Sequence, residues 1–168
     1  MQWIMEILRS LEDSPFALSI AESTWAFPAI ELVHIFALIM VFGTIVIIDL
    51  RLLGLASTNR RYSEMARELL PWTWAAWVVA AMFGSLMFIT RPLAYLENAD
   101  LRLKFTLMAM AGINMLVFQL VTSRDMARWD TGATPWVGKV AGGLSLMLWI
   151  GVVYFARRIG YTLVQGGV

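Results

Sequence analysis

The only histidine of the chain, His34, lies three residues after an acidic residue, Glu31, within a long apolar stretch. Residues three apart share one face of a helix, so the carboxylate and the imidazole can point the same way. Helical bundles present ligands to metal ions through such Glu-x-x-His pairs. One pair is half of a two-metal site, and symmetry-related copies of the chain would have to supply the rest.

Basic residues are expected at the same end of the molecule as His34, because the second span ends, the third begins and the fourth ends there. They are Arg91, Arg102, Lys104, Arg157 and Arg158. A basic ring beside a buried imidazole suits haem b, with His34 as an iron ligand. Arg91, Arg102 and Lys104 would then bind the propionates. In the alternative interpretation, these side chains extend to lipid headgroups and Glu31 pairs with one of them.

Two further polar groups within the apolar segments need partners. Asn114 lies near mid-membrane, where its amide either bonds another helix or contributes to the cofactor site. Met108 and Met110, on the same segment, are candidates for a second iron ligand. Asp49 ends the first span, where a carboxylate opposes the helix dipole, so we expect it to pair with an arginine. The candidates are Arg51, Arg124 and Arg128.

Composition identifies the environment in which these residues lie. Of the 168 residues, 60% are hydrophobic, and a soluble domain of this length has too little interior to bury them. The absence of cysteine excludes disulfides, iron–sulfur clusters, thiolate zinc sites and c-type haem attachment. A net charge of +1 gives no electrostatic reason to expect a nucleic-acid partner.

Four apolar segments reach the ~20 residues that a bilayer core requires. They cover residues 27–48, 72–89, 103–121 and 136–156. We predict an all-α integral membrane four-helix bundle, because only helices or closed barrels satisfy their backbone in lipid. Pro28 and Pro71 suit first helical turns, and Arg91-Pro92 should end the second span.

Residues 1–24 are predicted to form an amphipathic interfacial segment, and residues 25–168 the four-helix domain. Apolar residues at helical spacing define the first helix, with charged residues elsewhere on the wheel. They are Ile4, Ile7, Leu8 and Leu11. Ser14-Pro15 is typical of the start of a second short helix. The segment is too interrupted by charge for a cleavable signal peptide, and it would lie on the membrane or on a neighbouring subunit.

Charge asymmetry between the two faces is small. The positive-inside rule gives a marginal bias toward a cytoplasmic 49–71 loop, which would place both termini outside the cytoplasm. We therefore expect a multi-pass protein in contact with the lipid bilayer. Because so small a bundle gains a site or a pore by assembly, we also expect a homo-oligomer.

Several stretches together resemble a family of small four-span bacterial inner-membrane proteins of uncharacterised function. They are His34, Gly43, residues 49–54 (DLRLLG), Arg91-Pro92, Tyr95, Asn98, Lys104, residues 111–114 (AGIN) and residues 158–161 (RIGY). The chain is more distantly similar to copper-resistance protein D-type domains and to small membrane b-type cytochromes. Those cytochromes usually bind haem through two histidines, whereas this chain has one. The resemblance implies the four-span fold and highlights His34, Asp49, Arg51, Arg91, Lys104 and Asn114.

Three functions follow as hypotheses. The first is a haem b-binding redox or electron-transfer protein of the inner membrane, with a redox partner that the sequence does not identify. The second is an oligomeric metal-binding or ion-conducting protein in which Glu31 and His34 line the site, for example for copper. The third is a structural membrane protein without chemistry. Whether the protein is an enzyme stays open.

Overall fold

The computed structural model describes residues 2–121, 129–130 and 132–165 of the chain. Its four long helices are α3 (Ala26–Leu53), α4 (Tyr62–Thr90), α6 (Ala99–Val121) and α8 (Trp136–Gln165). Each of them contains a window that is long and apolar enough to cross a membrane. No strand occurs in the described part of the chain. The predicted all-α membrane bundle is therefore confirmed.

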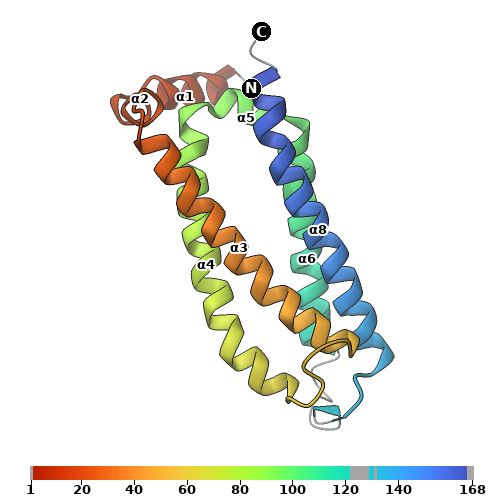
Figure 1. Cartoon of the computed structure of the whole chain (residues 1–168). Helices are drawn as coiled ribbons and strands as arrows, with labels where there is room; N and C mark the ends of the chain where they lie inside the picture. The colour runs from red at the N-terminus through yellow and green to blue at the C-terminus, as the bar shows by residue number, and fades with distance from the viewer. Residues whose placement is uncertain (1, 122–128, 131, 166–168) are drawn as a thin grey trace.

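The four long helices form two antiparallel pairs (Figure 1). Helix α3 packs along α4, α6 packs along α8, and α3 also contacts α8, which joins the pairs. Both termini lie at one end of the bundle, and residues 54–61 and 132–135 connect helices at the other. We call these the terminal end and the loop end. His34 lies toward the terminal end, and Arg51 lies at the loop end.

Apolar side chains cover the outside of the bundle. Ile39 of α3 is 60% exposed and Ile113 of α6 is 61% exposed, although both lie near the middle of their helices. A water-soluble bundle would bury such side chains. The pattern fits helices whose outer surface is solvated by lipid, and it explains why four spans can coexist with a small protein core.

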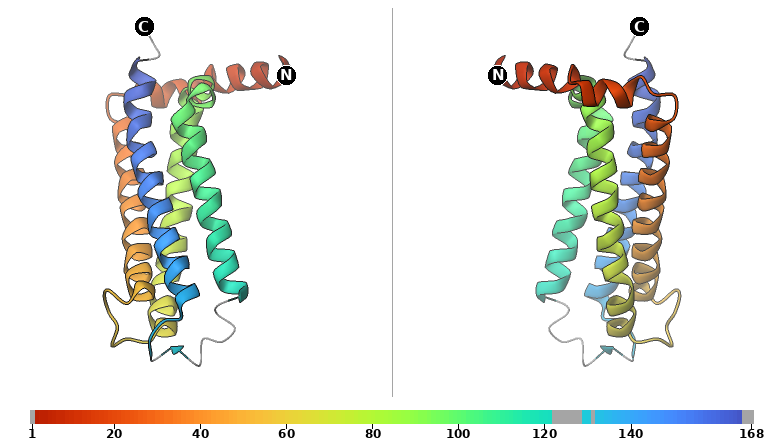
Figure 2. Two further views of the ribbon diagram at one scale, coloured as in Figure 1. Left: turned by 90° about the vertical axis from the view of Figure 1, so that its right-hand side faces the viewer. Right: turned by 90° about the vertical axis from the view of Figure 1, so that its left-hand side faces the viewer.

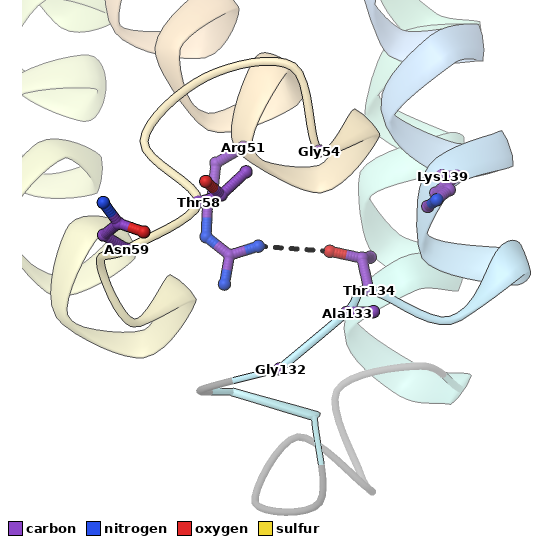
Figure 3. A pocket seen from close by; sticks show the side chains of 8 residues that line it. All are labelled: Arg51, Gly54, Thr58, Asn59, Gly132, Ala133, Thr134 and Lys139. Atoms are coloured by element: carbon purple, nitrogen blue, oxygen red, sulfur yellow. Dashed lines mark hydrogen bonds between the residues drawn. The ribbon is translucent and has the colours of Figure 1, made fainter.

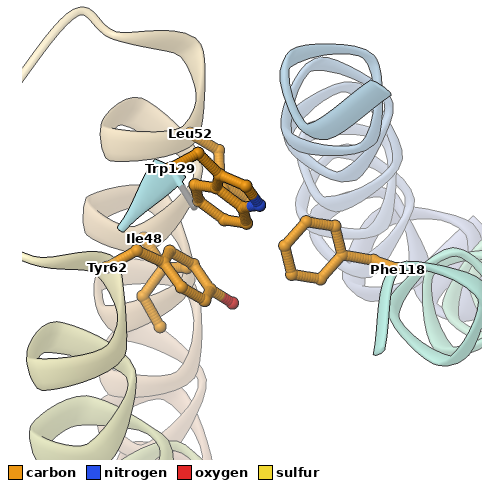
Figure 4. Packing of buried hydrophobic residues seen from close by; sticks show 5 residues of the cluster. All are labelled: Ile48, Leu52, Tyr62, Phe118 and Trp129. Carbon is orange, nitrogen blue, oxygen red and sulfur yellow. The ribbon is translucent and has the colours of Figure 1, made fainter. Parts of the chain in front are cut away.

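A compact aromatic core lies at the loop end (Figure 4). The ring of Tyr62 packs edge-on to Phe118, with 5.6 Å between centroids, and lies 5.5 Å from the ring of Trp129. Ile48 and Leu52 of α3 complete the cluster. Aromatic pairs of this geometry add to the free energy of area burial. This cluster fixes the loop end of α3, α4 and α6 together.

Helix boundaries differ from expectation mainly in α4. We expected the span to start at residue 72, but α4 begins at Tyr62, so Pro71 lies inside the helix and not in its first turn. The expectation that Pro71 lies in the first turn was wrong. Residues 62–71 include several charged side chains, which favoured a loop, but they form the first turns of α4 outside the apolar part of the helix. Proline within a membrane helix is tolerated when neighbouring groups compensate for the missing N–H.

The predicted end of the second span at Arg91-Pro92 is confirmed, whereas α3 continues to Leu53, α6 begins at Ala99 and α8 continues to Gln165, all beyond the predicted spans. Helix α4 ends at Thr90, directly before Arg91-Pro92, and the short helix α5 (Pro92–Glu97) follows. Helix α3 ends at Leu53 and is capped by Gly54, which has a φ of 76° and donates its N–H to the carbonyl oxygen of Arg51. Glycine adopts this left-handed conformation without the steric cost of a Cβ atom.

Two short helices precede the bundle, α1 (Gln2–Glu12) and α2 (Pro15–Ala21), and they lie across its terminal end (Figure 2). Ser14 caps α2, because its Oγ accepts the N–H of Ala17 at 3.2 Å, and Pro15 occupies the first turn. The predicted Ser14-Pro15 start is therefore confirmed. Helix α1 contacts α4 and α5 while Trp3 and Ile7 remain exposed.

Candidate functional site

The imidazole of His34 is held between α3 and α4. Its Nδ1 lies 2.7 Å from the main-chain oxygen of Ala80. A carbonyl oxygen can only accept a hydrogen bond, so Nδ1 carries the proton and Nε2 of the neutral ring keeps a lone pair. Ligating histidines in metalloproteins are commonly oriented in this way, by a carbonyl that accepts from the other ring nitrogen. His34 thus has one anchored nitrogen and one unprotonated nitrogen, whose lone pair is what a metal ligand needs.

Gly84 makes room for this ring, one helical turn beyond Ala80. A Cβ atom at Gly84 would lie 2.9 Å from Cε1 and 3.3 Å from Nδ1 of His34. Any larger residue would therefore displace the imidazole. In the sequence, Ala80 and Gly84 are recognisable only as small residues four apart on one helix. That spacing indicates close packing against another helix, but it does not identify the residue that packs there.

Lys104 of α6 is a cationic residue in the surroundings of His34. Its side chain is half-buried, and its ammonium is close enough to His34 to interact with it electrostatically. A third helix therefore contributes to the surroundings of His34. A cation beside the imidazole favours an anionic group there, such as a carboxylate of a cofactor.

Glu31 and Arg91 gather around Tyr95 of α5 and not around a common metal position. Burial of the Tyr95 hydroxyl raises its pKa, the Glu31 carboxylate raises it further, and Arg91 opposes them. Among the described residues, no group of three or more His, Cys, Asp or Glu side chains could hold a metal ion. Glu31 and His34 of one chain are thus short of a complete ligand set.

The basic residues at the terminal end have different environments. Arg158 lies 3.5 Å from the carboxylate of Asp100, which is buried at the start of α6. Arg157 bonds the hydroxyl of Tyr161 and lies over its ring. Arg102 and Arg91 are exposed, and within the described part of the chain neither forms an ion pair. Of the five residues expected to form a basic ring, Arg91, Arg102 and Lys104 thus remain available to an anion.

Asn114 has a partner within the bundle. Its Nδ2 donates to the main-chain oxygen of Ala141 at 2.9 Å, which links α6 to α8. Of its two predicted roles, the structure therefore provides the helix–helix bond. The cofactor role stays a prediction without a contact to support it.

The predicted pairing of Asp49 with Arg51 is wrong. Asp49 is buried and faces Ser145 of α8, whereas Arg51 points into the loops. Residues two apart on a helix do not face each other, so the two side chains diverge. Arg124 and Arg128, the other candidates, lie outside the described residues. The Oδ2 atom of Asp49 has no hydrogen-bond partner among the described groups.

The site at the terminal end therefore combines an anchored imidazole with a free nitrogen, a half-buried ammonium and two exposed guanidinium groups. Such a set can ligate a metal centre through one nitrogen and neutralise its acidic substituents. In comparisons with known proteins, no family model, curated protein or solved structure matches this chain.

Proposed function

We propose that this chain is a multi-pass protein of the bacterial inner membrane that binds haem b through His34 and takes part in electron transfer. The supporting observation is the hydrogen bond from Nδ1 of His34 to the Ala80 carbonyl oxygen, 2.7 Å long, which leaves Nε2 as a ligand.

The residues around His34 have the chemistry that would hold a haem iron and its acidic substituents. The Ala80 carbonyl orients the ring, Gly84 accommodates it, and Lys104 adds positive charge. Arg91 and Arg102 are exposed at the same end and supply further cations for propionates. When bound, a b-type haem would supply one-electron chemistry, and the protein tunes it through ligation and local charge.

A second iron ligand would come from another residue type or from another copy of the chain. Met108 is half-buried on α6, whereas Met110 is 48% exposed. Because the chain has a single histidine, a bis-histidine site requires His34 of a second copy. The proposal therefore includes a homo-oligomer as one of two ways to complete the iron coordination.

Visible absorption of protein from haem-supplemented cells tests the proposal. We expect a Soret band in the wild type and its loss in His34→Ala. Gly84→Ala should reduce haem content severalfold, because its Cβ would meet the ring at 2.9 Å. Gly112→Ala is the matched control, since no atom lies within 4 Å of the added Cβ.

A wild-type preparation without a Soret band would overturn the haem proposal. Elemental analysis of the same sample then separates the remaining hypotheses. A bound metal that is lost in both His34→Ala and Glu31→Gln would support the oligomeric metal site. A protein without metal, in which His34→Ala changes stability alone, would support a structural role.

A further inference from the structure

A polar cavity lies at the loop end, far from His34 (Figure 3). Its volume is about 340 Å³, and it is open to the outside of the bundle. Side chains from four segments line it: Arg51 from α3, Thr58 and Asn59 from the following loop, Thr134 from the segment before α8, and Lys139 from the first turn of α8. A polar cavity with two basic residues is unusual in a chain whose surface is mainly apolar.

Arg51 is the most buried charged residue that lines this cavity, with 1% of its surface exposed. Its guanidinium donates from Nε to the Arg60 carbonyl oxygen at 2.8 Å and from Nη1 to the Thr134 hydroxyl at 3.2 Å. Nη2 donates to the Asp130 carbonyl oxygen at 3.3 Å. All three acceptors are neutral oxygens, and a guanidinium has more N–H donors than these bonds use. A buried cation with only neutral partners favours a nearby anion.

Asp130, whose main-chain oxygen Arg51 bonds, has a carboxylate that is engaged elsewhere. Its carboxylate accepts the main-chain N–H of Ser63 at 2.8 Å and also the Ser63 hydroxyl. Within the described residues, Arg51 forms no ion pair with any carboxylate. Asp130 therefore balances part of the charge of Arg51 without bonding the guanidinium through its carboxylate.

Lys139 provides a second cation from the first turn of α8. Its side chain is exposed, lines the cavity and forms no ion pair within the described part of the chain. Trp136 of the same turn is 74% exposed, which is typical of a residue at the level of lipid headgroups. The cavity thus opens where phosphate groups of lipids and of solutes are both present.

We propose that this cavity binds a phosphate group, carried either by an anionic lipid or by a solute. The planar guanidinium of Arg51 suits two phosphate oxygens, and Lys139 adds a mobile point charge. Thr58 and Asn59 offer uncharged hydrogen-bond donors on the loop side. This proposal is independent of haem binding at the other end.

Thermal unfolding of the purified protein tests the proposal with two probes, the first applied in neutral detergent and the second in lipid vesicles. The first is inorganic phosphate, compared with chloride at equal ionic strength. The second is reconstitution into vesicles of phosphatidylcholine with or without phosphatidylglycerol. We expect at least one probe to raise the melting temperature, because a ligand of the folded state stabilises it.

Lys139→Gln should weaken the binding about tenfold, as expected for the loss of a charge-assisted contact. Arg67→Gln is the matched control, because Arg67 is an exposed residue near the same end that does not line the cavity. Arg51→Lys tests the bidentate contact, and if that variant does not fold, Lys139→Gln still decides the result.

A shift with inorganic phosphate that Lys139→Gln reduces identifies a solute site. A shift with phosphatidylglycerol alone, again reduced by Lys139→Gln, identifies a lipid headgroup site. No shift with either probe overturns the proposal, and so does a shift that Lys139→Gln leaves unchanged or that Arg67→Gln reduces equally.

Discussion

His34, Asn114 and Arg51 are polar residues in membrane helices, and each bonds a main-chain oxygen of another segment. The acceptors belong to Ala80, to Ala141 and, for Arg51, to two loop residues. A polar group without a partner in a bilayer is costly, so these bonds limit where each helix can lie. The Nε2 lone pair of His34 and two N–H groups of Arg51 are not used in these bonds. The amide of Asn114, in contrast, stabilises the contact between α6 and α8.

Replacing Asn114 with leucine should lower the free energy of unfolding by about 1 kcal/mol, the usual contribution of a hydrogen bond between membrane helices. Thermal or denaturant unfolding in detergent measures this loss. Met115→Leu, on the same helix and without a polar contact, should change little. If Asn114→Leu instead removed the Soret band at unchanged stability, Asn114 would belong to the cofactor site.

Asp130 makes the loop end sensitive to acid. Partial burial opposes its ionisation, but the two Ser63 hydrogen bonds and the nearby Arg61 and Arg51 hold its pKa below the ordinary value. The ionised carboxylate therefore contributes stability above about pH 3.9, and this is lost as the pH falls through the lower folded value. The melting temperature measured between about pH 6 and pH 3 should fall less steeply in Asp130→Asn than in the wild type.

Ser63→Ala removes one of the two bonds and should give an intermediate slope. An identical pH dependence in the wild type and in Asp130→Asn would show that Asp130 does not couple the loops to α4.

At the scale of elements, Gly142 sets the distance between α3 and α8. A Cβ atom there would lie 2.9 Å from the Cβ of Leu52 and 3.2 Å from the backbone oxygen of Asp49. These atoms belong to or adjoin the backbone of α3, so only movement of the helix can relieve the clash. Closely packed small residues are what allow membrane helices to approach in this way.

Gly142→Ala should therefore destabilise the bundle by about 1–3 kcal/mol, as overpacking does in other cores. Gly43→Ala is the matched control, because no atom lies within 4 Å of its added Cβ. Unfolding midpoints of the two variants provide the comparison. Equal effects of both substitutions would show that helix propensity, and not contact with α3, governs the result.

A hydroxyl pair also joins α3 to α4, since Thr73 donates to Thr44 at 2.8 Å. Each helix pair therefore has a polar link in addition to apolar contact. Helix α4 contacts α3 on both sides of Pro71, in the cluster that contains Tyr62 and Ile48 and at the Thr73–Thr44 bond, and these contacts support it as one helix.

For the whole molecule, the fold requires the loop end and the terminal end to lie on opposite sides of the membrane. Since the chain has no cysteine, single substitutions can report the side of each end. Leu55 is 74% exposed in the loop after α3, and Leu96 is 45% exposed in α5. From the positive-inside bias, Leu96→Cys should react with a membrane-impermeant maleimide in intact spheroplasts.

Leu55→Cys should react only after permeabilisation. The reverse pattern would correct the orientation and retain the fold, whereas reaction of both from one side would contradict four spans.

The two proposed sites lie at these opposite ends, so each belongs to a different aqueous face. Haem binding would concern the face near the termini, and phosphate binding the face near the loops. Either proposal can be disproved without affecting the other, because no described contact connects the two sites.

The sequence by itself determined the four spans, the amphipathic first helix and the polar residues that need partners. Hydrophobic length and helical periodicity are local properties, and the bilayer allows few alternatives. Only the tertiary structure decided that His34 bonds Ala80 against Gly84, that Asn114 bonds Ala141, and that Arg51 turns away from Asp49. These pairings depend on the rotation and register of helices distant in sequence, which the apolar pattern leaves open because nearly every face of each span is apolar.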